Sequence, residues 1–391
     1  MISIRNIIPQ QLRAMTWSLS PTLSPLLVLA GIQGIIYIYD PLSKERVSVL
    51  RGHGGRITSV TAHPRKPHII CTTSRDHTMR LWDLHLPKSM KVVAADPEAA
   101  RLGPPFGNPL TGGEEEGIGP GKCFAVSAGG VGDGHKATVL DASLHPFLNI
   151  VATSSVDHAV MLWMYEPPPS PTASVCTLAI IGRPVFCFKR FHMAQVIRVH
   201  WLSPSVLLSQ TSQSFSAEHD NFPGKLVVWE WLHYEALKEA AENGVKYARD
   251  YLNSTDSSSY KILAEVHIRQ PTAMPLSISG TMATLTTSSI IRVIDLSLLI
   301  ARARPDPDVA LLHRDLSLEH EEEWQEKLRE IKRQQWESAG NLWFPGVVDA
   351  VEIVNQNLEK TYNAVLYHGI LIRVGERERV QVWLPSEALS H

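Results

Sequence analysis

Two stretches of this chain repeat the same arrangement of side chains, and this repetition restricts the fold more than any other feature. Each stretch contains a histidine that follows a glycine, then a threonine, an aspartate in a turn sequence and a closing tryptophan. The repeated residues are His53, Thr72, Asp76 and Trp82 within residues 52–83, and His135, Thr153, Asp157 and Trp163 within residues 134–164. The aspartate and the tryptophan are 6 residues apart in both copies, and the histidine precedes the aspartate by 23 and then 22 residues. Chance matches rarely preserve both the period and the turn chemistry, so the copies indicate a repeated folding unit.

The four repeated residue types can form one hydrogen-bonded group inside a sheet. The carboxylate can accept a bond from the imidazole, the imidazole can bond the threonine hydroxyl, and this hydroxyl can accept from the indole N–H. Such a group is a structural latch and not a catalytic triad. The alternating strands around it match the four-stranded WD40 unit, whose apolar faces are covered only by neighbouring copies in a ring. The sequence therefore predicts an all-β fold, a WD40 β-propeller.

Apolar runs bounded by Gly and Pro predict further strands along the chain. The six expected blades occupy residues 12–50, 52–83, 134–164, 192–231, 261–296 and 347–385. We expect them to form one propeller domain over residues 1–391. The first dozen residues could be the remnant of a further blade.

Three stretches interrupt the blade pattern and are expected to be insertions. Residues 86–128 are rich in Gly, Pro and Glu, which predicts a flexible surface segment. Residues 232–259 carry a weak apolar stripe at helical spacing. Residues 313–340 have acids at the start and bases toward the end, as the helix macrodipole favours. Both helices are expected on the propeller edge, and a docking helix for another chain is the alternative for the second.

Composition and missing motifs exclude several classes of function. A formal net charge of -2 and a pI near 6.8 give no basic footprint for direct nucleic-acid binding. No apolar run approaches the roughly 20 residues of a membrane helix, and no signal peptide opens the chain. The four cysteines lack a CxxC pair, which fits a reducing compartment. The phosphate-loop-like residues 129–136 have His135 where a lysine is needed. The chain also lacks a G-x-S-x-G or H-E-x-x-H motif, so we expect no enzyme, catalytic residue, cofactor or metal site.

Several segments point to a more specific family. Asp-His pairs precede two closing strands, at Asp76-His77 and at Asp157-His158. Other segments with this likeness are GIIYIYDP at 34–41, GHGGRITSVTAHPRKP at 52–67, GGVGDGHKATVLDA at 129–142 and VIRVHWLSPSVLLSQ at 196–210. Over about residues 14–230 the chain resembles the EED/ESC (Extra sex combs) family, the WD40-repeat subunit of Polycomb repressive complex 2 (PRC2). Beyond residue 232 the resemblance is poor.

The resemblance implies a seven-bladed propeller, whose first blade is incomplete here, in a non-enzymatic scaffold subunit of PRC2. In that family one face of the propeller holds a helix of the SET-domain histone methyltransferase. The other face binds trimethyl-lysine of the histone H3 tail in an aromatic cage, which stimulates methylation of lysine 27 and gene silencing. The implied partners are therefore the methyltransferase, the other Polycomb subunits and the histone H3 tail, and the implied location is the nucleus.

The family's cage falls at positions that are not aromatic in this chain. By resemblance these positions lie near Arg13, Ala273 and Met274. A trimethylated lysine is held by the faces of aromatic rings, and an arginine would repel it. Either the chain has kept the scaffold function and lost the reader function, or its N-terminus is truncated and the alignment slips beyond residue 260.

The alternative function is that of a WD40 scaffold in another complex, such as a substrate receptor of a cullin ubiquitin ligase. Receptors of that kind often carry Trp-Asp-x-Arg after a blade. Here Trp82 and Asp83 are followed by Leu84 and then by His85 in the place of the arginine.

Overall fold

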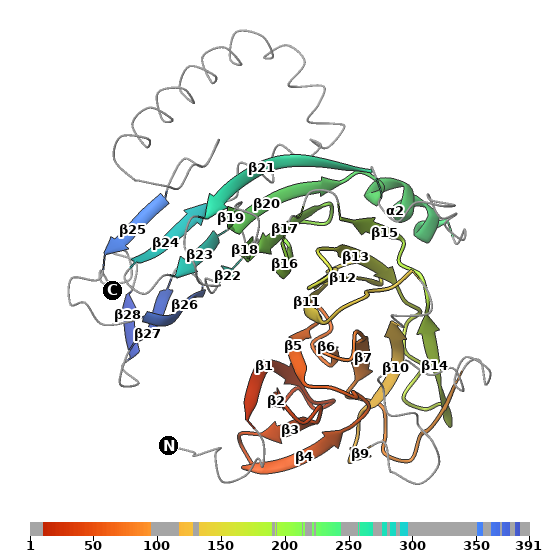
Figure 1. Cartoon of the computed structure of the whole chain (residues 1–391). Helices are drawn as coiled ribbons and strands as arrows, with labels where there is room; N and C mark the ends of the chain where they lie inside the picture. Colours follow the sequence, from red (N-terminus) through yellow and green to blue (C-terminus); the bar gives the residue numbers. More distant parts are fainter. Residues whose placement is uncertain are drawn as a thin grey trace, which may run out of the picture. The chain divides into compact units, whose positions relative to one another are not determined.

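The computed structural model divides the chain into two compact units. Unit 1 comprises residues 1–204 and 233–259, and unit 2 comprises residues 205–232 and 260–391. The structure describes residues 11–94, 117–127, 133–189, 192, 194–212, 214–215, 221–222, 224–243, 257, 259–268, 276–279, 282–286, 290–295, 350–354, 361–367, 370–375 and 380–383. Strands dominate both units (Figure 1), so the predicted all-β fold is confirmed. The single ring over residues 1–391 stays a prediction.

The first sheet of unit 1 forms from the apolar runs of the first expected blade. Its strands lie in the order β1-β2-β3-β4-β9, each antiparallel to its neighbour. The bounds are β1 (Leu12–Leu19), β2 (Pro25–Gly31), β3 (Ile36–Asp40), β4 (Glu45–Leu50) and β9 (Gly117–Ile118). Asp40 shapes the β3–β4 turn, because its Oδ1 accepts the backbone N–H groups of Leu42 and Ser43. Asp40 thus ends β3 and stabilises the turn that follows it.

The second sheet contains the first repeated unit and has two additional strands. Its order is β5-β6-β7-β10-β14-β8. The bounds are β5 (Ile57–Ala62), β6 (Ile69–Ser74), β7 (Met79–Asp83), β8 (Lys91–Ala94), β10 (Lys122–Ser127) and β14 (Val175–Ile181). Because β14 pairs in parallel with both β10 and β8, this sheet extends beyond the usual four strands at its outer edge.

The third sheet contains the second repeated unit, in the order β11-β12-β13-β15. The bounds are β11 (Val139–Leu144), β12 (Ile150–Ser155), β13 (Val160–Met164) and β15 (Phe186–Phe188), followed in the chain by β16 (Val196–Trp201). The inner strands β1, β5, β11 and β16 lie side by side in this sequence (Figure 1). Polar contacts join them: Thr58 Oγ1 donates to the carbonyl oxygen of Val139 over 2.6 Å, and the N–H of Val199 donates to Asp141 Oδ2.

The core of unit 1 lies between successive sheets, because side chains alternate across each strand. Ile69 and Cys71 of β6 pack toward the third sheet, whereas Ile70 packs toward the first. In β7, Leu81 and Trp82 divide between the same two clusters. Strands covered on both faces need apolar residues at successive positions, which explains why β6, β7 and β12 are buried throughout.

Among its described residues, unit 2 contains three larger sheets and one two-stranded sheet, β18-β19. One joins β17, β20 and β21, the next has the order β22-β23-β24-β25, and the last has the order β26-β27-β28. The bounds are β17 (Val206–Thr211), β18 (Ser214–Phe215), β19 (Asn221–Phe222), β20 (Gly224–Trp231), β21 (Tyr260–Ile268), β22 (Leu276–Ser279), β23 (Met282–Thr286), β24 (Ile290–Asp295), β25 (Ala350–Val354), β26 (Thr361–Tyr367), β27 (Ile370–Gly375) and β28 (Val380–Trp383). With the three sheets of unit 1, the three larger sheets account for the six expected blades.

Two strands belong to different blades from those predicted. The expected fifth blade opened with residues 261–268, but this strand, β21, pairs with β20 of the preceding sheet. The expected sixth blade opened with residues 347–354, but β25 pairs with β24. In both cases the error has one cause. The fourth, outer strand of each of these blades comes a long way along the chain after the third strand. Its position in the sequence therefore suggests that it opens the next blade.

The prediction of a flexible insertion over residues 86–128 is wrong at both ends. β8 and β10 lie inside this range, and β10 occupies the fourth position of the second sheet. Its residues Cys123, Phe124, Ala125 and Val126 are buried. The Gly-rich run before it masked a strand whose neighbours, β7 and β14, are remote in the chain. Residues 95–116 lie outside the described residues.

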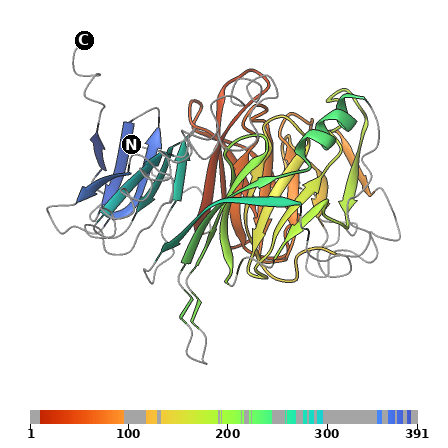
Figure 2. The same ribbon diagram turned by 90° about the horizontal axis from the view of Figure 1, so that it is seen from above.

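The expected helix after residue 232 is present over a shorter range. Helix α2 (Tyr234–Glu242) lies at one end of the strands of unit 1 (Figure 2). The Tyr234 ring stacks on His145 at 5.7 Å between centroids, and Leu237 is buried. Later in the expected insertion, the backbone N–H of Ser257 donates to the carbonyl of Cys187.

Other predicted segments lie outside the described residues. These are residues 1–10, with the possible remnant of a further blade, and the charged helix predicted over residues 313–340. In the part of the chain that the structure describes, no helix has the length and apolar character needed to cross a membrane.

Candidate functional site

The structure brings together all four predicted residues of the first latch. His53 Nδ1 lies 2.9 Å from Asp76 Oδ2, and His53 Nε2 lies 2.8 Å from Thr72 Oγ1. The indole of Trp82 donates to the same hydroxyl over 2.9 Å. An indole N–H can only donate, so the hydroxyl proton can point to His53 Nε2 and the proton on Nδ1 to the carboxylate. This assignment satisfies every member with a neutral imidazole.

Burial and hydrogen bonding set the charge states in this latch. Desolvation lowers the pKa of His53 below its ordinary value and outweighs the attraction of Asp76, which keeps the ring neutral at pH 7. Burial acts to raise the pKa of Asp76, but His53, Thr78 and Arg80 together hold that pKa well below its usual range. Asp76 also accepts the backbone N–H groups of Gly54 and Thr78. The carboxylate is therefore charged and fully bonded.

The second latch repeats this geometry on the third sheet. His135 Nδ1 lies 3.1 Å from Asp157 Oδ2, and His135 Nε2 lies 2.7 Å from Thr153 Oγ1. Trp163 Nε1 donates to the same hydroxyl over 2.7 Å. Where the first latch has the hydroxyl of Thr78, the second has Ala159, and the carboxylate of Asp157 accepts only the backbone N–H there. The second latch therefore makes fewer bonds.

These latches hold sheets together and do not present a nucleophile. The side chains of His53 and Asp76 are fully buried, and Trp82 occupies a lone pair of the Thr72 hydroxyl. Trp82 packs toward the first sheet, and Trp163 packs toward the second. Each latch therefore holds its tryptophan on the face of the sheet that packs against the preceding sheet.

The His-Pro pairs that end β5 and β11 form a second kind of structural site. His63 Nδ1 accepts the backbone N–H of Arg65 and of Lys66. His145 Nδ1 accepts those of Phe147 and Leu148, and its Nε2 donates to the carbonyl oxygen of Pro204. Burial lowers the pKa of each of these two histidines to about 4. Both rings are neutral at pH 7 and organise the turn that follows.

The Asp-His pairs noted in the sequence lie in the turns between the second and third strands of their blades. His77 and His158 have φ values of 68° and 66°, in the left-handed region. The turn places the preceding aspartate at the latch, which explains the pair in mechanical terms.

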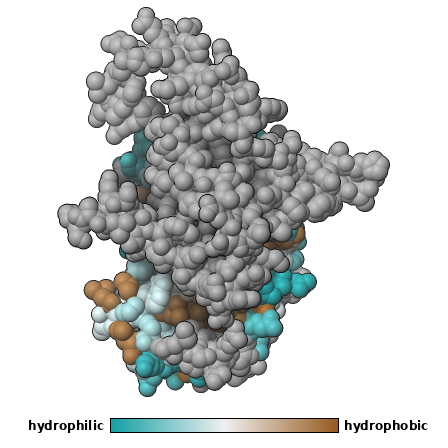
Figure 3. Space-filling view, turned by 90° about the vertical axis from the view of Figure 1, so that its left-hand side faces the viewer, coloured by the Kyte–Doolittle hydropathy of each residue, from teal (hydrophilic) through white to brown (hydrophobic). Residues whose placement is uncertain are grey.

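Of the three positions that the resemblance assigns to a methyl-lysine cage, the structure describes one, and that residue is not aromatic. Arg13 lies exposed on β1, while Ala273 and Met274 lie outside the described residues. The same strand exposes large apolar side chains, with Met15 at 62% and Trp17 at 57%. Figure 3 shows apolar surface on the side of the molecule that contains the first sheet.

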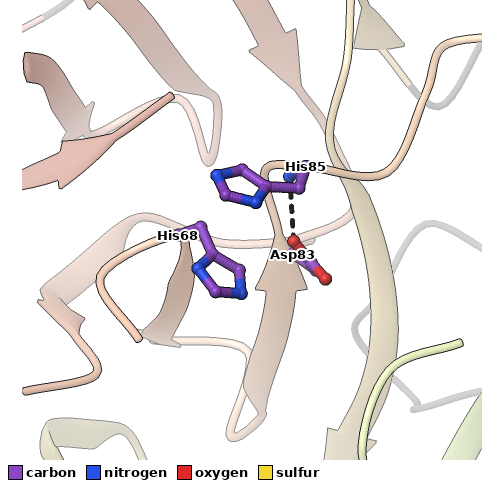
Figure 4. A group of neighbouring side chains, drawn as sticks. All are labelled: His68, Asp83 and His85. Atoms are coloured by element: carbon purple, nitrogen blue, oxygen red, sulfur yellow. Dashed lines mark hydrogen bonds between the residues drawn. The ribbon is translucent and has the colours of Figure 1, made fainter. Parts of the chain in front are cut away.

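One cluster was missed by the sequence analysis. His68, Asp83 and His85 offer ligand atoms that all lie within 4.8 Å of one another (Figure 4). His68 and His85 are 17 positions apart, so only strand register brings them together. The available signal was the histidine in the arginine position of the Trp-Asp-x-Arg pattern, next to Asp83.

Comparisons with known proteins agree with this geometry. The family model described as WD domain, G-beta repeat, matches residues 44–83 and 129–164, which contain both latches. Polycomb protein esc of Drosophila melanogaster is 28% identical over 149 residues, which cover 38% of this chain and 26% of that protein. Polycomb protein EED of Chaetomium thermophilum is 39% identical over 72 residues, 18% of this chain and 13% of that protein. The chain thus spans about a quarter of the fly protein.

A solved structure extends the likeness in fold to nearly the whole chain. It is that of Chaetomium thermophilum Polycomb Repressive Complex 2 bound to GSK126, with a TM-score of 0.62 and 18% identity. The match covers 97% of this chain and 84% of the matched chain. Repeats, sheets and fold define the chain as a WD40-repeat β-propeller protein. Its homologues are Polycomb proteins of the esc and EED type, and the resemblance found in the sequence is confirmed.

Proposed function

We propose that the chain is a non-catalytic scaffold subunit of a Polycomb repressive complex 2. In this role it supports a SET-domain methyltransferase that acts on lysine 27 of histone H3, in the nucleus and in gene silencing. The observation that carries the proposal is the sequence similarity to Polycomb protein esc over 149 residues and to Polycomb protein EED over 72 residues. A fold shared with a chain of a solved PRC2 adds support.

A scaffold role fits the chemistry of the repeated side chains. The imidazoles of His53 and His135 are engaged in buried hydrogen bonds, and so are the hydroxyls of Thr72 and Thr153. Groups used in this way stabilise sheets and are not available to a substrate. What unit 1 offers to other proteins is a rigid set of sheets with exposed turns and edges, which is the usual interaction surface of a propeller.

We propose that this chain acts as a scaffold and does not bind trimethyl-lysine. Arg13 is exposed and carries the same charge as the ligand, whereas a cage requires ring faces. A trimethylated lysine-27 peptide of histone H3 is therefore expected to bind no more tightly than the unmodified peptide. Fluorescence polarisation with both peptides measures this difference. Tighter binding of the trimethylated peptide would assign the reader function to the chain.

Affinity purification from nuclear extract with mass spectrometry tests the scaffold proposal. The tagged chain is expected to recover a SET-domain methyltransferase together with other Polycomb subunits. Recovery of a cullin adaptor without any methyltransferase would instead support the ubiquitin-ligase alternative.

A matched bait sharpens the distinction between these two complexes. His85→Arg restores the Trp-Asp-x-Arg pattern after β7. If the chain is a cullin receptor, the variant should enrich the adaptor more strongly than the natural chain does. If the chain is a Polycomb scaffold, both baits should recover the methyltransferase to the same extent.

A further inference from the structure

The cluster of His68, Asp83 and His85 lies at the open end of the β6–β7 hairpin, opposite the turn that contains Asp76. Ile69 pairs with Asp83, and the backbone N–H of Leu84 donates to the carbonyl of His68 over 3.0 Å. This pairing fixes the backbone of His68 and Asp83, and the N–H of His85 donates to Asp83 Oδ1. Asp83 ends β7, and the two histidines lie in the turns next to the paired strand ends.

The donor set is that of a transition-metal site. Two imidazole nitrogens and one carboxylate oxygen suit Zn²⁺ and, with similar chemistry, Co²⁺ or Ni²⁺. Asp83 is buried at 3% exposure, while the two histidines are half-buried and can be reached from solvent. A buried carboxylate beside two accessible imidazoles combines a charged ligand with an entry path for an ion.

The outer contacts of the cluster orient two of the three ligands. His85 Nε2 lies 3.2 Å from the carbonyl oxygen of Leu19, so Nε2 carries the proton and Nδ1 keeps its lone pair. Asp83 Oδ1 accepts the backbone N–H of His85 over 2.8 Å, which leaves the other carboxylate oxygen available (Figure 4). Contacts of this type, from a ligand to a backbone group, are typical of metal-binding histidines and carboxylates.

We propose that His68, Asp83 and His85 form a three-ligand site for a divalent transition metal of the zinc class. The ligand atoms lie within 4.8 Å of one another, and a tetrahedral zinc site needs about 3.3 Å between ligands, given bonds of about 2.0 Å. Side-chain rotation supplies the difference. A fourth position is left for water or for a group from a partner.

One ring must turn for the metal to bind. The two imidazoles are stacked, with centroids 4.1 Å apart and planes inclined by 15°, and a metal lies in the plane of each ring that coordinates it. The ring that turns is that of His68, because His85 is held by Leu19. In the described residues no hydrogen bond is recorded for the His68 ring. Metal binding therefore breaks the stack of the two imidazoles and gives each imidazole a coordinate bond to the metal.

Titration of the purified, tag-free full chain with Co²⁺ and then with Zn²⁺ tests the site. We expect one equivalent of Co²⁺ to give the visible bands of four-coordinate cobalt, and Zn²⁺ to displace it and raise the Tm as its concentration rises. His68→Gln and Asp83→Asn should each weaken binding by at least about 10-fold. Because His68 is half-buried, the His68→Gln variant should keep the natural fold, which circular dichroism checks.

A matched control removes a histidine elsewhere in unit 1. His158 is exposed on the third sheet and has φ 66°, which asparagine tolerates, so His158→Asn should leave metal binding unchanged. Equal Co²⁺ spectra and equal Zn²⁺ affinity for the natural chain and for His68→Gln would overturn the proposal. So would the absence of four-coordinate cobalt bands in the natural chain.

Discussion

At the scale of single residues, the hydroxyl of Thr72 is the centre of the first latch. It accepts from Trp82 and contacts His53, which in turn bonds Asp76. All of these groups are withdrawn from water, so a missing partner leaves the others without compensation. The latch therefore stabilises the fold only when all four side chains are present and hydrogen-bonded.

Removing the indole N–H should reveal this dependence. Trp82→Phe keeps an aromatic ring and leaves Thr72 without its donor, so we expect the free energy of unfolding to fall by about 1–3 kcal/mol. Urea denaturation followed by far-UV circular dichroism measures the loss. Trp17→Phe is the matched control, because Trp17 is 57% exposed on β1 and its replacement should change little. Equal denaturation midpoints for the two variants would mean that the latch contributes nothing.

The His-Pro histidine His145 predicts a pH dependence of stability. Its pKa is about 4 in the folded chain against 6.5 as the ordinary value, because burial disfavours the charged ring. As pH falls from about 6.5 to 4, the unfolded chain therefore takes up the proton first, and stability is lost over that interval.

His145→Asn isolates this contribution. The amide oxygen can accept the same two backbone N–H groups but does not titrate in this range. We expect the variant to be less stable at pH 7 and to show a flatter fall of Tm between pH 6.5 and 4. The exposed residue His158, changed to Asn, serves as the control and should keep the natural slope. A natural slope in His145→Asn would assign the acid sensitivity to other groups.

At the scale of elements, the short strand β9 fastens residues 117–121 across the edge of β4. Gly117 has φ 142°, and a Cβ there would overlap the carbonyl oxygen of Val49. Ser48 Oγ lies 2.9 Å and 2.6 Å from the carbonyl oxygens of Ile118 and Pro120. The glycine thus allows a close approach that no other residue permits.

Gly117→Ala should therefore separate β9 from β4. We expect a loss of about 1–3 kcal/mol in the free energy of unfolding, since both the overlap and the backbone angle oppose the methyl group. Gly182→Ala is the matched control in unit 1, because a Cβ at that glycine meets no atom within 4 Å. Chemical denaturation of the two variants gives the comparison. A cost at Gly182 as large as that at Gly117 would contradict this explanation.

The sequence was informative where strands and latches depend on nearby residues. Alternation and turn residues predicted the blades over residues 12–50 and 52–83, within which β1 to β7 lie, and the spacing of His53 and Asp76 predicted their bond. Where a neighbour is remote, prediction failed. The parallel pairing of β14 with β8 joins residues about 80 positions apart, and β21 and β25 close sheets after long connections. The cluster around Asp83 has the same character, because strand register and not local sequence creates it.

In the molecule as a whole, the two latches lie at different boundaries between neighbouring sheets. Trp82 faces the first sheet from the second, and Trp163 faces the second from the third. Each sheet of unit 1 is thus stabilised by its neighbour, as in repeat architectures generally. In the proposed scaffold role, such a protein influences a reaction through the proteins that it binds.

The indirect effect of a scaffold on a histone mark can be measured in cells. If the chain is the scaffold of a Polycomb methyltransferase, cells that lack it should lose methylation of histone H3 lysine 27, because the enzyme depends on its scaffold. Quantitative mass spectrometry of histone peptides measures this loss, with lysine-4 methylation as the internal control. Re-expression of the natural chain should restore the modification. Lysine-27 methylation that persists in cells lacking the chain would separate it from the methyltransferase and favour a scaffold role in another complex.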